Sequence, residues 1–230
     1  MTAAHCKITD WRNSAGQFDA LAVEYDRWFE NNPLFTIELT ALRAIETQLS
    51  RPFLEIGVGP GRFAQALQAE YGIDPALSAL QLARQRNIEV IRAIGEELPV
   101  RSGCIGTVFL LFTLCFLADP ALVLQECQRI LQPKGHLVLG LIPKASAWGK
   151  GLERKKNEGN PFYRHAKLPS VAETIEMAGI RGLTLTDACS TLFYPPSGEA
   201  AEESPRREFN EYAGFNVLVF TQKETVSETT

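Results

Sequence analysis

The chain has 230 residues, of which 45% are hydrophobic and 22% charged, and this apolar content is enough for one sizeable core. Its formal net charge of −4 at pH 7 provides no overall basic field, so nucleic acid is not expected as a main partner. Five widely spaced cysteines without a C-x-x-C pair predict neither a disulfide framework nor a zinc site, and no metal is expected.

The N-terminus and the apolar runs argue against export and membrane insertion. Residues 1–16 lack a basic segment followed by an apolar stretch. The longest apolar run, 108–118, is shorter than the about 20 residues that a bilayer span requires. We therefore expect a cytoplasmic protein that does not associate with membranes.

Helices and strands are predicted to alternate along most of the chain. Helical spacing over 18–29 and 34–49 predicts two amphipathic helices that cover an edge of the core. The following elements are then expected: strand 53–56, helix 62–70, strand 71–74, helix 75–86, strand 88–94, strand 107–112, helix 119–131, turn 132–135 and strand 136–142. This alternation predicts a doubly wound α/β fold with a parallel sheet covered on both faces.

The remaining third of the chain is less regular. Residues 143–168 are basic and mixed with aromatic residues, and they predict a long solvated loop or lid. Helix 170–179 with Gly179 as its stop, strand 183–188, an acidic excursion over 195–212 and a closing strand 214–222 follow. We expect a single domain divided into an N-terminal helical extension or lid (1–50), a core (51–222) and a disordered tail (223–230).

The segment FLEIGVGPGRF, residues 53–63, places three glycines at alternate positions between the first sheet strand and its helix. Such a loop lies at the carboxyl edge of the sheet, where doubly wound folds bind ligands. Glycine allows the backbone to turn sharply and to approach a ligand closely. The dinucleotide pattern G-x-G-x-x-G is not met, because its sixth position is Arg62. A tight turn without a ligand is the structural alternative.

Two carboxylates accompany this loop. Glu55 stands two residues before the first glycine, where a negative charge favours a cationic or amine-bearing ligand over a second anion. S-adenosylmethionine carries both a sulfonium and an ammonium group. Asp74 ends the second strand, where these folds place an acid on ribose hydroxyls. A capping role for Asp74 ahead of Pro75, and a solvated strand-end charge for Glu55, are the structural alternatives.

Four segments resemble, in order and spacing, the motifs of class I S-adenosylmethionine-dependent methyltransferases, particularly the small-molecule branch called methyltransferase type 11: LEIGVGPGRFAQAL, YGIDPALSALQLAR, AIGEELPV and LQPKGHLVLGLI. The resemblance implies a Rossmann-like seven-stranded sheet whose last strand, near 215–221, runs antiparallel. It also implies methyl transfer from S-adenosylmethionine to a small-molecule acceptor by in-line displacement. The residues that it implies at the cofactor are Tyr25, Glu55, Gly57, Gly59, Gly61, Asp74, Pro75, Ile94, Gly95 and Glu96.

Three positions depart from the family pattern. Ile94 and Gly106 stand where relatives usually carry Asp, and Pro60 replaces a frequent Thr or Ser in the glycine loop. These departures keep open a non-catalytic protein that binds S-adenosylmethionine without turnover. An NAD-dependent oxidoreductase on a similar fold is the other alternative.

Candidate residues for the acceptor site come from three segments, namely the first helix, the residues after the fourth strand and the long basic segment. They are Trp28, Thr113, Tyr163 and His165, of which His165 is also a candidate general base. No catalytic residue is assigned, because the sulfonium leaving group is already activated and alignment can supply much of the acceleration. The acceptor atom and the oligomeric state stay open.

Overall fold

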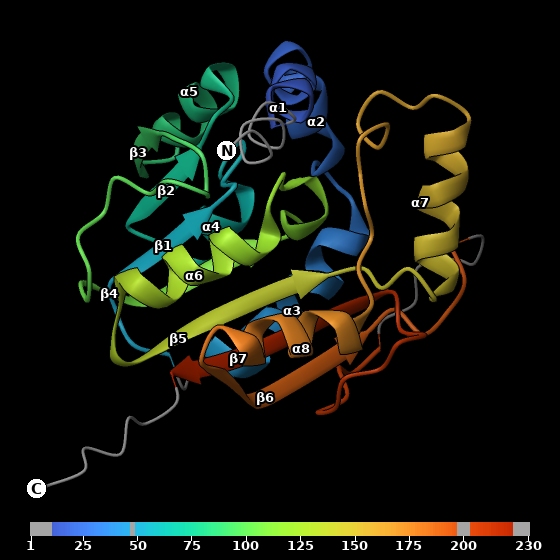
Figure 1. Ribbon diagram of the computed structural model, residues 1–230. Helices are drawn as coiled ribbons and strands as arrows, with labels where there is room; N and C mark the ends of the chain where they lie inside the picture. Colours follow the sequence, from blue (N-terminus) through green and yellow to red (C-terminus); the bar gives the residue numbers. More distant parts are fainter. Residues whose placement is uncertain (1–10, 47–48, 197–202, 223–230) are drawn as a thin grey trace, which may run out of the picture.

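The computed structural model describes residues 11–46, 49–196 and 203–222. They form one seven-stranded sheet with helices packed against it (Figure 1). The strands are β1 (Phe53–Ile56), β2 (Tyr71–Asp74), β3 (Glu89–Arg92), β4 (Ile105–Leu111), β5 (Leu131–Leu141), β6 (Leu183–Thr191) and β7 (Phe215–Gln222). Cys6 and the tail 223–230, which was expected to be disordered, lie outside the described residues.

The sheet has the order β3-β2-β1-β4-β5-β7-β6. Strands β1 to β5 are parallel, whereas β7 pairs antiparallel with both β5 and β6. The predicted Rossmann-like sheet with an antiparallel last strand is therefore confirmed. The direction of winding reverses between β1 and β4, and in doubly wound folds this reversal opens a ligand crevice at the carboxyl edge.

Two hydrophobic cores, one on each face of the sheet, hold the helices in place. One face packs against α3 (Pro33–Glu46), α4 (Arg62–Leu67) and α5 (Leu77–Gln85), and the other against α6 (Pro120–Ile130) and α8 (Val171–Ile180). Alternate residues of β4 supply the two cores, Phe109 to the first and Val108 and Leu110 to the second. All seven residues of β4 are buried, as expected for a central parallel strand.

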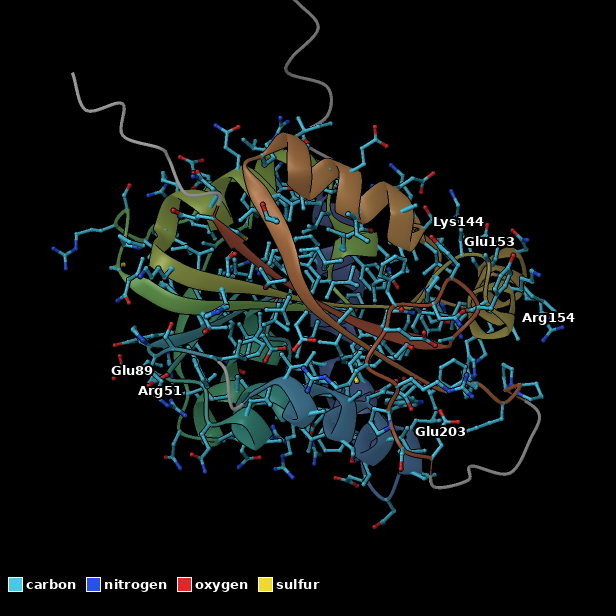
Figure 2. The ribbon with its side chains drawn as sticks, turned by 90° about the horizontal axis from the view of Figure 1, so that it is seen from below. Arg51, Glu89, Lys144, Glu153, Arg154 and Glu203 are labelled. Atoms are coloured by element: carbon cyan, nitrogen blue, oxygen red, sulfur yellow. The ribbon has the colours of Figure 1, made fainter. Side chains whose placement is uncertain are left out.

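Three helices lie beside the carboxyl edge of the sheet, toward which the arrowheads of β1, β2 and β5 point in Figure 1. They are α1 (Trp11–Ala20), α2 (Ala22–Trp28) and α7 (Ala147–Asn157). Figure 2 shows Arg51 and Glu89, at the amino ends of β1 and β3, on the opposite side of the molecule from Arg154 of α7. Every helix in the described part of the chain is too short or too polar to cross a membrane.

The predicted boundaries were wrong in two of the helical regions. The expected helix 18–29 divides near Leu21 into α1 and α2, and α1 begins at Trp11. The predicted loop 143–168 contains the eleven-residue helix α7, capped by the Ser146 hydroxyl, which accepts a hydrogen bond from the backbone N–H of Gly149. The sequence did not reveal α7 because the segment is mostly polar and glycine-containing, with few apolar residues to mark a buried face.

Smaller differences concern the ends of elements. Residues 132–135, expected as a turn, form an irregular part of β5 where its pairing with β4 shifts register, and Lys134 has a left-handed φ of 63°. Gly179 does not stop a helix, because α8 continues to Ile180. The left-handed turn there is made by Gly182, with a φ of 76°.

Candidate functional site

The glycine loop after β1 folds into a tight cradle. Gly57, Gly59 and Gly61 have positive φ angles of 73°, 50° and 81°, a backbone conformation that favours glycine. A Cβ atom on Gly57 would overlap the Thr113 side chain, and a Cβ on Gly61 would lie 2.6 Å from Cδ1 of Ile88. Gly57 and Gly59 line a cavity at the carboxyl edge, whereas Gly61, the N-cap of α4, packs closely against Ala83 of α5 and Ile88.

Asp74, at the end of β2, faces this loop. Its Oδ2 atom accepts a hydrogen bond from the Gly59 N–H at 2.9 Å, and Oδ1 accepts one from the Ala76 N–H at 2.8 Å. Burial raises its pKa to about 6, despite the two backbone donors that favour the charged form. Each carboxylate oxygen retains a further lone pair, so Asp74 can accept two more hydrogen bonds from a diol.

Glu55 lies one layer deeper, at the end of β1. The side chain is 3% exposed and accepts a hydrogen bond from the Ala64 backbone, while its Oε2 atom has no partner among the described residues. Burial raises its pKa well above the ordinary value, and the nearby Asp74 carboxylate adds to the shift. A ligand that brings positive charge to this loop would favour the ionised form of Glu55.

An ion-pair cluster fixes the N-terminal helices to the loop. Asp26 of α2 accepts hydrogen bonds from Arg62 at 2.6 and 2.8 Å and from Arg86 at 2.9 Å to each carboxylate oxygen. Arg86 also donates to the Pro60 carbonyl oxygen at 2.9 Å. Arg62, the residue that breaks the dinucleotide pattern, thus holds α2 over the loop.

This arrangement encloses a first cavity of about 110 Å³. Its wall contains eight of the ten residues predicted at the cofactor: Tyr25, Gly57, Gly59, Asp74, Pro75, Ile94, Gly95 and Glu96. The other two, Glu55 and Gly61, lie behind the wall. The Oε1 atom of Glu96 accepts hydrogen bonds from the backbone N–H groups of Ala118 and Asp119, at 3.1 and 3.2 Å.

A second and larger cavity, of about 740 Å³, adjoins the first. Both are lined by Tyr25 and Phe116. These two rings and those of Phe18 and Phe162 pack with centroids 5.1 to 5.8 Å apart, and we call these four residues the aromatic partition. The partition lies at the boundary of the two cavities, because Phe18 lines the first, Phe162 lines the second, and Tyr25 and Phe116 line both. Its residues come from α1, α2, η1 (Leu114–Phe116) and the segment after α7.

The backbone of the second cavity is unusual at two positions. Phe112 and Leu192, which both line it, have left-handed φ angles of 57° and 63°. Bulky side chains rarely adopt this conformation, and the strain concentrates at functional sites. The Phe112 ring stacks on Phe215 at a centroid distance of 4.9 Å, which holds it against the cavity wall.

The predicted acceptor residues are not all brought together. Trp28 and Tyr163 line the second cavity, and Thr113 lines the first. His165 is exposed and lines neither of them, so its place beside an acceptor stays a prediction. In the described part of the chain, no three His, Cys, Asp or Glu side chains gather in a way that could hold a metal ion.

The predicted site residues do not include Glu38, Phe18, Phe116 or Phe162, which line the two cavities. Glu38 had a usable signal, because it lies among buried apolar residues of α3 such as Ile37 and Leu42. The three phenylalanines come together only through the packing of separate segments. The departure at Gly106 also has a physical reason, since a Cβ there would overlap the carbonyl oxygens of Ser50 and Arg51.

Comparisons with known proteins agree with this geometry. A family model described as a methyltransferase domain matches residues 54–139. A crystal structure from Thermotoga maritima, described as an S-adenosylmethionine-dependent methyltransferase and possible histamine N-methyltransferase, superposes with a TM-score of 0.84 at 30% identity, covering 91% of this chain and all of that one. The chain belongs to the class I S-adenosylmethionine-dependent methyltransferases of type 11.

Two curated relatives are described as uncharacterized proteins. One, from Methanocaldococcus jannaschii, is 34% identical over 177 residues, which are 76% of this chain and 85% of that protein. The other, from Mycobacterium tuberculosis, is 37% identical over 187 residues, which are 80% of this chain. The match spans 65% of the mycobacterial protein's own length.

The residues of the first cavity fit S-adenosylmethionine, the cofactor of this methyltransferase family. Asp74 offers acceptors for the two ribose hydroxyls, and Gly57 and Gly59 line the same cavity. The unpartnered Oε2 atom of buried Glu55 suits a ligand with an ammonium and a sulfonium group. A pyrophosphate would instead add negative charge beside two buried carboxylates, which disfavours NAD.

Proposed function

We propose that this methyltransferase transfers the methyl group of S-adenosylmethionine to a small-molecule acceptor bound in the second cavity. One observation carries the proposal most directly. The predicted cofactor cavity and the larger cavity share Tyr25 and Phe116 as walls, so a sulfonium held in the first lies next to an acceptor in the second. Loop residues that were predicted from the glycine motif supply the cofactor side.

The side chains on the two sides have different tasks. Asp74 and the loop glycines would hold the nucleoside, and the aromatic partition would exclude water from the space between the ligands. When bound, S-adenosylmethionine supplies a methyl group that its sulfonium has already activated. Catalysis then depends chiefly on aligning the acceptor atom with the methyl–sulfur bond, and we place this contact at the wall that Tyr25 and Phe116 provide to both cavities.

A binding and turnover experiment tests this proposal. We expect S-adenosylhomocysteine to bind the purified protein in calorimetry and NAD to give no heat. Incubation with S-adenosylmethionine and a panel of amines, phenols, thiols and carboxylates should release S-adenosylhomocysteine with at least one acceptor. Preferential binding of NAD would reject the proposal. Cofactor binding without turnover on every acceptor would favour the non-catalytic alternative.

The acceptor and the cellular setting complete the proposal. The Thermotoga maritima relative is described as a possible histamine N-methyltransferase, which supports a nitrogen acceptor. Cys104, Cys115, Cys127 and Cys189 are free thiols, which supports a reducing cytoplasm. The acidic chain supports a small molecule rather than nucleic acid as the partner.

A further inference from the structure

Glu38 is a buried carboxylate at the second cavity that the motifs of the chain do not explain. The residue lies on α3, is 3% exposed and lines the cavity. Its Oε2 atom has no hydrogen-bond partner among the described residues. A buried polar atom without a partner costs free energy, which a ligand that donates a hydrogen bond can recover.

No cation of the described part of the chain forms an ion pair with Glu38. Burial alone raises its pKa to about 8, so the side chain is mostly protonated at neutral pH in the absence of ligand. A positively charged group in the cavity would supply the missing partner and would favour the ionised form of Glu38.

The other titratable groups that face this space are neutral near pH 7. They are Tyr25 of α2, Cys115 of η1, Tyr163 after α7 and Tyr194 after β6. Burial raises the pKa of each of them, to about 12 for Cys115 and Tyr163. The remaining charged residues of the wall are exposed at the mouth of the cavity: Glu24, Arg27, Arg154 and Lys155.

The rest of the wall suits a cation with an apolar body. Its aromatic side chains include Trp28, Phe29, Trp148, Phe162 and Tyr163. The faces of aromatic rings attract cations, and the attraction is stronger where water is excluded. A carboxylate acceptor would instead meet the Glu38 carboxyl group in an apolar surrounding, which is unfavourable.

We propose that the acceptor is a basic nitrogen compound, an amine or a nitrogen heterocycle carried on an apolar body, and that Glu38 binds its nitrogen and removes its proton. This inference rests on the proposed methyl transfer. Glu38 and Glu55 both lie within electrostatic reach of the Tyr25 hydroxyl, which places Glu38 near the wall that the two cavities share.

The proposed step requires only Glu38, the amine, S-adenosylmethionine and solvent. The Glu38 carboxylate accepts one proton from the ammonium group, which frees the nitrogen lone pair. That pair forms the new N–C bond while the methyl–sulfur bond breaks and its electrons stay on sulfur, leaving S-adenosylhomocysteine. The methylated nitrogen carries the positive charge, and the proton passes from Glu38 to solvent when the product leaves. A raised pKa suits a carboxylate to this exchange near neutral pH.

Matched probes test the inference. Tryptamine and 2-phenylethylamine are compared with their neutral isosteres tryptophol and 2-phenylethanol, and 4-ethylphenol represents oxygen acceptors that can be deprotonated. Binding is measured by calorimetry on protein saturated with S-adenosylhomocysteine, and methylation by mass spectrometry with S-adenosylmethionine. We expect each amine to bind at least about tenfold more tightly than its alcohol. As Glu38 ionises between pH 6 and pH 8, we expect this ratio of affinities to increase by up to about tenfold per pH unit.

Two variants complete the test. Glu38→Gln keeps the shape of the side chain but removes its charge, and we expect it to lose the amine preference and amine methylation. Glu89→Gln is a charge-matched control that should retain both, because Glu89 does not line the cavity and Figure 2 shows it on the opposite side of the molecule from Arg154 of α7. Unchanged binding of S-adenosylhomocysteine shows that both variants are folded.

Two results would overturn the inference. One is binding of the alcohols or 4-ethylphenol as tight as that of the amines, or no amine binding at millimolar concentration, while S-adenosylhomocysteine still binds. The other is an amine preference that survives in Glu38→Gln. If S-adenosylhomocysteine does not bind even the unaltered protein, the proposed function fails, and this inference fails with it.

Discussion

At the scale of single residues, Asp74 is the residue on which we expect cofactor binding to depend most. Both of its oxygens already accept backbone N–H groups, which orients them toward the first cavity. We expect Asp74→Ala to weaken S-adenosylhomocysteine by roughly 30-fold, because charge-assisted hydrogen bonds contribute about 2 kcal/mol. Calorimetry on the folded variant measures this. Affinity equal to that of the unaltered protein would show that the ribose binds elsewhere.

Glu38 also predicts how stability depends on pH. Its folded pKa of about 8 lies above the ordinary value of 4.5, so the folded protein holds a proton that the unfolded chain releases between these values. The contribution of this residue therefore falls as pH rises toward 8, by about 1.4 kcal/mol per pH unit. We measure the free energy of unfolding by denaturant titration at pH 6 and at pH 8. We expect its decrease between these two pH values to be smaller in Glu38→Gln than in the unaltered protein. Equal losses would contradict the burial of an unpaired carboxyl group.

At the scale of elements, the ion-pair cluster around Asp26 joins α2 to the glycine loop and to α5. Removal of Asp26 leaves two partly buried arginines without their shared partner, and loss of a buried ion-pair member costs about 3 kcal/mol. We expect Asp26→Ala to lower the free energy of unfolding by about this amount. We also expect weaker S-adenosylhomocysteine binding, because α2 carries Tyr25.

Glu30→Ala is the matched control for this cluster. The Glu30 Oε1 atom lies 3.3 Å from the Nη2 atom of Arg62, and the Glu30 side chain is 58% exposed. An exposed pair of this kind contributes at most about 1 kcal/mol. Chemical denaturation of both variants decides the point, and similar effects for Asp26→Ala and Glu30→Ala would mean that α2 is not held by this cluster.

Apolar periodicity made most elements predictable, whereas the misses concern a mostly polar helix and a break between two helices. The apolar run of β4 and the spacing of α6 identify a buried strand and an amphipathic helix without further information. Helix α7 has three basic residues in its last turn and few apolar positions, so it does not differ locally from a solvated loop. The break between α1 and α2 depends on docking to the core, which local spacing does not reveal.

The cofactor side of the site was more predictable than the acceptor side. The loop glycines and Asp74 lie at fixed distances from strand ends, so the topology of a doubly wound fold places them together. The second cavity is built from α2, α3, the end of β4, α7 and the segment after β6, which are far apart in the chain. Its residues meet only after folding, and His165 shows that closeness in sequence to Tyr163 is not enough.

At the scale of the whole molecule, two cavities share one aromatic partition at the carboxyl edge of a single sheet. The sheet places the glycine loop on one side of the partition, and the helices α2, α3 and α7 line the larger cavity on the other. In such a division, one fold can keep the same loop at the first cavity while separate segments set the shape of the second.

A crystal structure of the protein with S-adenosylhomocysteine tests this account most directly. We predict that the ribose hydroxyls lie on Asp74, that the methionine part lies along Gly57 and Gly59, and that the sulfur faces Tyr25 and the second cavity. A nucleoside bound away from Asp74, or a sulfur directed away from the aromatic partition, would contradict the account.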